Sequence, residues 1–160
     1  NQTFKNYEVI VIDNSSTDGT IKKLTKIKDD RFKIFSINNK GILAKSRNLG
    51  IKKSNAEWVA FLDSDDWWTE DKLEVCFNNI NNKVGLIYHD LEIKSNQPRP
   101  FGRKKNKSRQ LKKPVLNDLL IGGNAISNSS VIVRKKLLEK IGFIDENKDL
   151  PASELSLIHI

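Results

Sequence analysis

The alternation of apolar and polar positions along the chain predicts strands separated by helices. Four short aliphatic runs have the composition of buried strands, at residues 7–12, 32–37, 58–62 and 84–88. Between them, apolar residues recur at helical spacing with polar residues on the opposite face, at residues 21–27, 43–53 and 70–80. Strands that alternate with helices predict an α/β fold with a doubly wound, mostly parallel sheet.

The alternation stops over residues 92–113, which are charged and have almost no apolar content. This composition predicts a mobile basic loop. After it we expect a short helix at residues 114–121, a strand at 125–133 and a helix at 135–141 that Gly142 ends. With 160 residues, the chain has the size of one ordinary domain.

The net charge of +8 indicates an anionic partner, which could be nucleic acid, an acidic membrane surface or a phosphorylated ligand. Much of this charge lies between Arg99 and Lys113. A basic run is typical of a solvated loop, and its functional interpretation is an electrostatic hold on anionic lipid head groups. The run lacks the interleaved aromatic residues and motifs of nucleic-acid-binding proteins, so we do not expect nucleic acid as the partner.

Cysteine content and the length of the apolar runs limit the class of protein further. The single Cys76 excludes a disulfide framework and a multi-cysteine metal site, which favours a reducing compartment. It falls in an apolar helical stripe with Leu73, Phe77 and Ile80, so we predict that it is a core residue. No run approaches the roughly 20 apolar residues that span a bilayer, and residues 1–6 do not resemble a signal peptide. We expect a cytoplasmic protein that rests on the inner face of the membrane through its basic run.

Three carboxylates crowd the end of the strand predicted at residues 58–62. Asp63, Asp65 and Asp66 would repel one another there unless a positive group lay between them. Mg²⁺ or Mn²⁺ suits this position, because these cations take oxygen ligands from one or two carboxylates and leave other positions to phosphate oxygens. The alternative for so short a pattern is a solvated acidic turn that caps the next helix.

Two more polar side chains are expected at the same edge of the sheet. Asp13 follows the first predicted strand, and Arg47 lies on the helix before the strand at residues 58–62. Ligands of open α/β sheets bind at the carboxyl ends of strands, where a carboxylate can accept hydrogen bonds from a base or ribose. An arginine nearby can add charge-assisted bonds. With a metal, these groups describe a nucleoside-diphosphate site, although singly Asp13 reads as a turn residue and Arg47 as a surface charge.

Four segments resemble the family 2 glycosyltransferases in their order and spacing. They are Asn-Gln-Thr-Phe at residues 1–4, Val-Ile-Val-Ile-Asp-Asn-Ser-Ser-Thr-Asp-Gly-Thr at 9–20, Ala-Lys-Ser-Arg-Asn-Leu-Gly at 44–50 and Phe-Leu-Asp-Ser-Asp-Asp at 61–66. The resemblance covers nearly the whole chain up to Glu154. It therefore implies a partial domain over residues 1–154 and a tail at residues 155–160 that does not resemble the family. It implies a GT-A type, nucleotide-diphospho-sugar transferase fold, and an inverting transfer from a UDP-, dTDP- or GDP-sugar to an acceptor hydroxyl. The setting that it implies is synthesis of a surface polysaccharide, cell wall or lipid-linked glycan.

The same resemblance implies roles for four residues of this chain. Asp13 looks like the acid that contacts the nucleobase, and Arg47 like the basic residue beside the nucleotide. Asp63 and Asp65 match the family's Asp-x-Asp motif. Asp65 would bind Mn²⁺ or Mg²⁺, and Asp63 would contact the ribose or a metal-bound water. The acceptor implied is a glycan or a lipid-linked glycan.

The catalytic base is the part of the pattern from which this chain departs. An inverting transfer needs a carboxylate that takes the proton from the acceptor hydroxyl. Glu154 matches the first member of the family's Glu-Asp pair, but Leu155 stands where the catalytic aspartate is expected. We therefore expect the 160-residue chain itself to be inactive, and a nucleotide-binding fragment without turnover is the alternative function.

The family also opens with a strand and a helix before the segment that residues 1–4 resemble. In a doubly wound sheet this missing first strand would be central, between the strands at residues 7–12 and 58–62. Its absence would leave two buried edges unpaired, at about 1–3 kcal/mol for each unsatisfied backbone group. We expect the isolated chain to be unstable or to aggregate.

Overall fold

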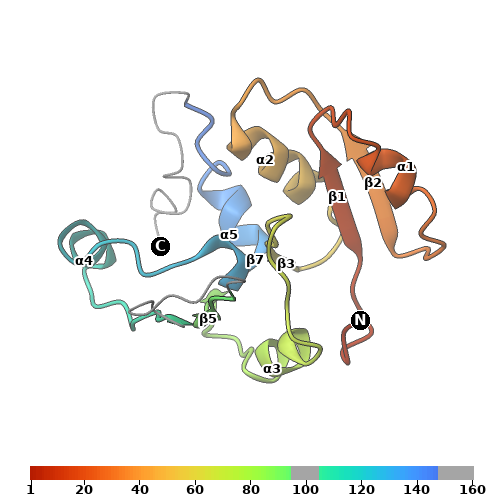
Figure 1. The fold of residues 1–160 in the computed structure, drawn as a ribbon. Coiled ribbons are helices and arrows are strands. Elements are labelled where there is room, and N and C mark those ends of the chain that lie inside the picture. Colours follow the sequence, from red (N-terminus) through yellow and green to blue (C-terminus); the bar gives the residue numbers. More distant parts are fainter. Residues whose placement is uncertain (95–104, 148–160) are drawn as a thin grey trace.

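A parallel pair of strands forms the first unit of the fold in this computed structural model, which describes residues 1–94 and 105–147 (Figure 1). β1 (Val9–Asp13) pairs in parallel with β2 (Phe32–Ser36), and α1 (Thr20–Leu24) lies in their connection. Lys33 and Glu8 join the two strands through an ion pair of 2.7 Å. These elements confirm the first strand, helix and strand predicted from the hydrophobic pattern, with α1 shorter than expected.

The second sheet has three short strands and an antiparallel centre. β7 (Ile132–Arg134) lies between β3 (Trp58–Ala60) and β4 (Leu86–Ile87) and runs antiparallel to both. β3 and β4 therefore point in the same direction, but the sequence did not predict a strand of opposite direction between them. A long segment after β4, rather than a βαβ crossover, connects the chain to β7. Strands joined by a βαβ crossover are parallel, and because β7 is not joined in this way it can run in the opposite direction.

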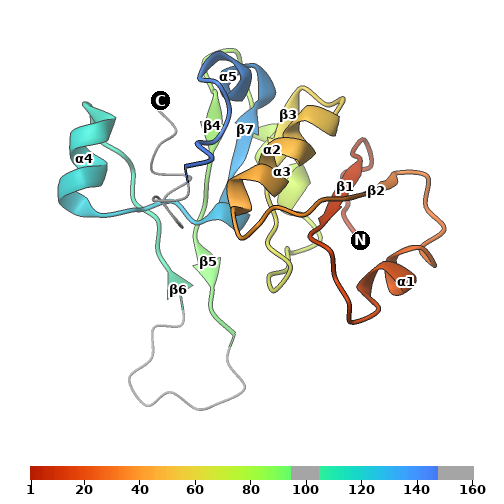
Figure 2. The ribbon, with the colours of Figure 1, turned by 90° about the horizontal axis from the view of Figure 1, so that it is seen from above.

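The segment between β4 and β7 contains a strand pair that its composition did not predict. β5 (Leu91–Glu92) pairs antiparallel with β6 (Lys105–Asn106). α4 (Val115–Gly122) confirms the short helix expected at residues 114–121. Figure 2 shows β5, β6 and α4 on the side of the molecule away from α1. Residues 95–104, the centre of the predicted mobile loop, lie outside the described residues.

The core lies between the second sheet and two helices, α2 (Leu43–Lys53) and α5 (Lys135–Lys140). α2 has the bounds expected from the sequence, and it also packs on β1. The buried apolar residues of the core are Ile42, Ala44, Ile51, Phe61, Ile126, Val131, Val133, Leu138 and Ile144. These residues come from both halves of the chain. Because α2 contributes to this core and also packs on β1, it connects the two sheets.

The buried face of α3 (Lys72–Asn78) differs from the predicted apolar stripe. Cys76 is buried, as predicted. Phe77 is 51% exposed, however, while Lys72 at the start of the helix is only 5% exposed. Phe77 instead meets Phe4, with the two ring centroids 4.7 Å apart. The helix is thus rotated so that a lysine takes a place that the pattern gave to an apolar residue.

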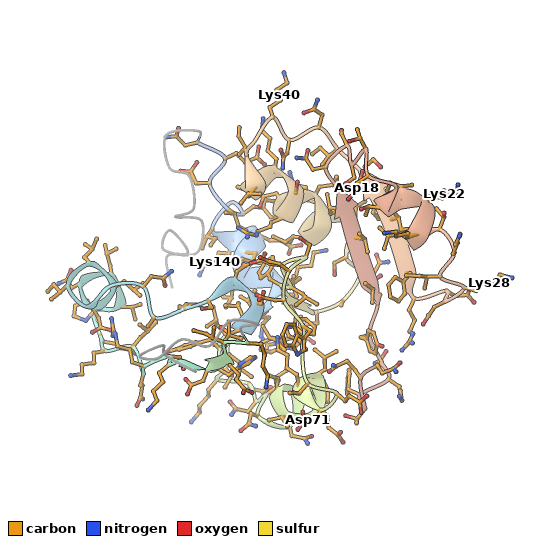
Figure 3. All side chains as sticks on the ribbon, viewed as in Figure 1. Asp18, Lys22, Lys28, Lys40, Asp71 and Lys140 are labelled. Atoms are coloured by element: carbon orange, nitrogen blue, oxygen red, sulfur yellow. The ribbon has the colours of Figure 1, made fainter. Side chains whose placement is uncertain are left out.

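β1 and β3 belong to separate sheets in the described structure. The low stability expected of the isolated chain remains a prediction. Of the helices described, α2 is the longest at 11 residues, and none has the length and apolar content needed to traverse a bilayer. Part of the positive charge lies far from the basic run, since Lys22, Lys28 and Lys40 point outward around the rim in Figure 3.

Candidate nucleotide-sugar site

The predicted carboxylates follow β3 and rest on a short 3-10 turn, η1 (Asn128–Ser130). The Asp63 backbone N–H donates to Ser129 Oγ at 3.0 Å, and Asn128 Nδ2 donates to Asp63 Oδ1 at 2.7 Å. The strand expected at residues 125–133 begins only at Ile132, because side chains here bond the local backbone, as Ser130 Oγ does to the Ser127 carbonyl at 2.6 Å. The turn thereby fixes both the backbone and the carboxylate of Asp63.

Ser129 also holds the far end of the acidic loop. Its carbonyl oxygen accepts hydrogen bonds from Trp68 Nε1 at 2.8 Å and from Lys72 Nζ at 3.1 Å. The Lys72 ammonium lies 3.6 Å from the centroid of the Trp68 ring, a cation–π contact. The neighbouring Trp67 is exposed, so Trp68 is the tryptophan that packs in this loop. Residues 63–68 are therefore anchored at both ends on one buried serine.

The carboxylate of Asp65 lies in the exposed middle of this loop. Among the described side chains it has no hydrogen-bond or ionic partner, whereas Asp63 Oδ1 is bonded by Arg47 and Asn128. No three His, Cys, Asp or Glu side chains converge as a metal site within residues 1–94 and 105–147. A Mg²⁺ or Mn²⁺ ion needs only one or two carboxylates when phosphate and water supply the rest, so the donor set fits such an ion with Asp65 as the free ligand.

Arg47 comes to Asp63 from the neighbouring helix. Its Nη2 lies 3.2 Å from Asp63 Oδ1, and its side chain, from α2, is mostly buried. The structure therefore brings together two residues that the sequence placed at one edge of the sheet. The guanidinium offsets the charge of Asp63 and leaves Asp65 as the open carboxylate.

Asp13 is buried at the carboxyl end of β1, where it shapes the loop that follows. Its Oδ2 accepts a hydrogen bond from the Ser16 backbone N–H at 3.2 Å. Beyond it, buried Asn39 donates to Ser46 Oγ at 2.9 Å, which ties the chain after β2 to the turn of α2 that carries Arg47. No hydrogen bond joins Asp13 to Asp63 or Asp65 in the described structure, so a shared ligand would have to connect them.

Two buried polar atoms at this edge have no hydrogen-bond partner among the described residues, Asn128 Oδ1 and His89 Nε2. Because the Nδ2 of Asn128 must face the Asp63 carboxylate, its Oδ1 is the atom left as a free acceptor. His89 follows β4, whose carboxyl end lies at the same edge as that of β3. An unpaired acceptor beside Asp63 suits an O–H donor, such as a ribose hydroxyl or a metal-bound water. Asn128 was not predicted from the sequence, and the serine-rich segment around it was the available signal.

Burial alters the titration of two groups behind the loop. Desolvation lowers the pKa of Lys72 from 10.5 to about 8, and no described carboxylate pairs with it. Burial raises the pKa of the Cys76 thiol, and the nearby Lys72 ammonium opposes this rise. Burying the Lys72 ammonium without a described counter-ion lowers the stability of the fold. We therefore infer that its contacts with Trp68 and Ser129 position the acidic loop.

The catalytic candidate Glu154, and Leu155 beside it, lie outside the described residues. The chain that leads toward them is fixed by buried Asn48 of α2. Asn48 Nδ2 donates to the Ile144 carbonyl at 2.8 Å, and its Oδ1 accepts from the Ile144 N–H at 3.0 Å. The same Nδ2 bonds Glu146 Oε1 at 2.9 Å. The Asn48 side chain thus bonds both the N–H and the carbonyl of Ile144, as a neighbouring strand would.

Asn48→Ala should lower the free energy of unfolding by about 2–4 kcal/mol, because it leaves the buried N–H and carbonyl of Ile144 without partners. Chemical denaturation of the whole protein measures this change. Asn78→Ala is the control. It is a substitution of the same type at an exposed position of α3, and it should change stability little. Equal effects of the two substitutions would contradict the role given to Asn48.

The fold and the acidic loop together define the class of protein. The structure resembles the crystal structure of Staphylococcus aureus TarS 1–349 in complex with UDP, with a TM-score of 0.72 and 24% identity, covering 99% of this chain and 46% of that one. This likeness establishes the predicted GT-A type fold. The chain matches the model of glycosyl transferase family 2 over residues 1–142, and it belongs to that family.

Curated relatives are more similar in sequence but considerably longer. An uncharacterised glycosyltransferase of Rickettsia conorii is 50% identical over 98 residues, which are 60% of this chain and 16% of that protein. The Escherichia coli UDP-Glc:alpha-D-GlcNAc-diphosphoundecaprenol beta-1,3-glucosyltransferase WfgD is 34% identical over 96 residues, 59% of this chain and 38% of WfgD. The chain therefore spans well under half the length of either relative.

Proposed function

We propose that the protein containing this chain is a metal-dependent, inverting glycosyltransferase that moves a sugar from a nucleotide-diphospho-sugar to an acceptor hydroxyl. The observation that carries the proposal is the acidic loop at residues 63–68 of a family 2 chain, held at both ends by Ser129 with the Asp65 carboxylate free. A flexible acidic turn would have no need of such anchoring.

Each residue of the site has its own proposed role in binding the donor. We assign Asp13 to the nucleobase and Arg47 to the nucleotide beside Asp63, while Asp65 would ligate Mn²⁺ or Mg²⁺. Asp63 and the free Oδ1 of Asn128 would then receive a ribose hydroxyl or a metal-bound water. The bound cation would offset the negative charge that develops on the leaving diphosphate.

The acceptor and the cellular setting follow from the relatives by analogy. The name of WfgD specifies a UDP-glucose donor and an undecaprenol-linked acceptor. By analogy, we propose a lipid-linked or glycan acceptor, a role in surface polysaccharide or cell wall synthesis, and a site of action at the inner face of the membrane. A UDP-sugar is the first donor to test.

The proton acceptor for the attacking hydroxyl lies outside the segment that the structure describes. Glu154 is the catalytic candidate of this chain, as the match to the first member of the family's Glu-Asp pair. Leu155 has no group that accepts a proton, so the 160-residue chain alone should be inactive. The second candidate function is a nucleotide-binding fragment that does not catalyse transfer.

Calorimetric titration of the whole protein with UDP, dTDP and GDP, each with and without Mn²⁺, tests the proposal. We expect one nucleotide to bind in a manner that depends on Mn²⁺, because a cation between Asp65 and the diphosphate neutralises both. Absence of nucleotide binding by the folded whole protein would refute the transferase function. Binding without release of sugar to any acceptor would instead favour the non-catalytic candidate.

A further inference from the structure

Helix α4 presents apolar side chains on a face that the described protein does not cover. Leu116 is 49% exposed, Leu120 is 75% exposed and Ile121 is 89% exposed. Leu116 and Leu120 are four residues apart and share one face of the helix, with Ile121 next to it. In Figures 1 and 2, α4 stands at the edge of the molecule, away from α2 and β1. We call these three residues the α4 apolar face.

The opposite side of α4 is held by the end of the basic run. Asp118, the acidic residue of the helix, forms an ion pair with Arg109, whose Nη2 also donates to the Asp118 carbonyl at 2.9 Å. The Lys112 N–H donates to Asp118 Oδ2 at 3.2 Å. Arg109 lowers the pKa of the Asp118 carboxyl. The helix is therefore oriented by its polar side, and its negative charge is neutralised.

Exposed lysines precede the α4 apolar face in the sequence. Lys112 and Lys113 come immediately before the helix, and Lys107 comes five residues before Lys112. Residues 105–123 contain five basic residues and one acidic residue, the Asp118 that Arg109 already pairs. Apolar residues flanked by lysines are typical of helices that lie in a membrane interface. The centre of a protein–protein interface is, by contrast, depleted in lysine.

We propose that α4 docks on an anionic lipid surface, with Leu116, Leu120 and Ile121 among the acyl chains and Lys112 and Lys113 at the head groups. This inference deepens the membrane contact included in the proposed function, and it assigns that contact to particular residues. A lipid-linked acceptor would enter from the same surface. The competing occupant of this face is a part of the protein outside the described residues.

A fluorescent probe on α4 distinguishes these occupants. We would attach an environment-sensitive fluorophore at Leu120→Cys in the whole protein with its native cysteines replaced, and at Val75→Cys on α3 as the control, since Val75 is also exposed and apolar. Vesicles of phosphatidylcholine alone, or mixed equally with phosphatidylglycerol, would then be added. Circular dichroism would verify that both labelled proteins are folded.

We expect the probe at position 120 to shift its emission to the blue with the phosphatidylglycerol vesicles, while the probe at position 75 does not change. Reversal of charge in Lys112→Glu with Lys113→Glu should weaken vesicle binding at least about tenfold. A probe at position 120 that is unaffected by vesicles, already shielded without them, or shifted no more than the control would overturn the proposal. The readout needs neither donor nor acceptor, so its failure would leave the transferase proposal intact.

Discussion

Asp65→Asn should reduce sugar transfer by the whole protein about 100-fold or more and remove the dependence of nucleotide binding on Mn²⁺. The amide has nearly the same shape as the carboxylate but lacks the charge that binds a hard cation. Since Asp65 has no partner among the described side chains, the substitution leaves the loop contacts of Ser129 in place. Initial rates and calorimetric titration with and without Mn²⁺ measure the two effects.

Asp66→Asn is the matched control for this experiment. Asp66 directly follows Asp65 and is also exposed. Its backbone N–H contributes to the turn by donating to the Asp63 carbonyl at 3.1 Å. Its replacement changes the net charge by the same amount and should alter the rate little. Loss of activity in both variants to the same degree would show that the charge of the loop matters rather than a ligand at Asp65.

Lys72→Met should stabilise the fold at pH 7 by up to about 3 kcal/mol, because it removes a buried cation whose pKa burial lowers from 10.5 to about 8. Methionine has a similar length and no charge to desolvate. Below pH 8 the lysine is charged in both the folded and the unfolded chain, so the folded state bears the full cost. Chemical denaturation of both proteins at pH 7 measures the gain.

The gain should shrink as the pH rises from about 8 toward 10.5. In this window the unfolded chain holds Lys72 protonated and the folded chain does not, so unfolding takes up a proton and the wild type becomes more stable with pH. Cys76, whose pKa burial raises, has the opposite effect above about pH 9, but it is present in both proteins and largely cancels in their difference. A gain that is constant with pH would contradict the burial of a charged Lys72.

The same substitution should weaken nucleotide binding, although it stabilises the fold. Methionine cannot donate to the Ser129 carbonyl, and it places no charge over the Trp68 ring. The acidic loop then loses one of the contacts at its carboxyl end. A more stable protein with a less ordered site is the pattern expected of a residue kept for positioning.

The first three strands and α2 could be predicted from the sequence because their signals are local. Aliphatic runs gave β1, β2 and β3 close to their observed bounds, and the acidic residues after β3 marked the edge of the sheet where Arg47 meets Asp63. The reversed direction of β7 could not be predicted, since nothing in Ile132–Arg134 specifies the direction of a strand.

The roles of Asn128, Ser129 and Lys72 in supporting the site could not be predicted, for a related reason. Asn128 and Ser129 bond Asp63 across more than 60 positions of sequence, and polar residues in a serine-rich stretch read equally well as a surface loop. Lys72 reads as the solvent-facing position of a helix, and only the packing of α3 against η1 buries it. Contacts between segments that are distant in the sequence determine whether such residues are buried. The periodicity of apolar residues contains no information about these contacts.

The dependence of the acidic loop on Ser129 also sets an order of events during synthesis. Asp63 and Trp68 leave the ribosome well before their anchor, which is 66 and 61 residues further along the chain. Until η1 docks, the aspartates have no platform and repel one another. A nascent chain that has β3 but not yet β7 should therefore be unable to hold a nucleotide, and ligand would reach the protein only after its second sheet has closed.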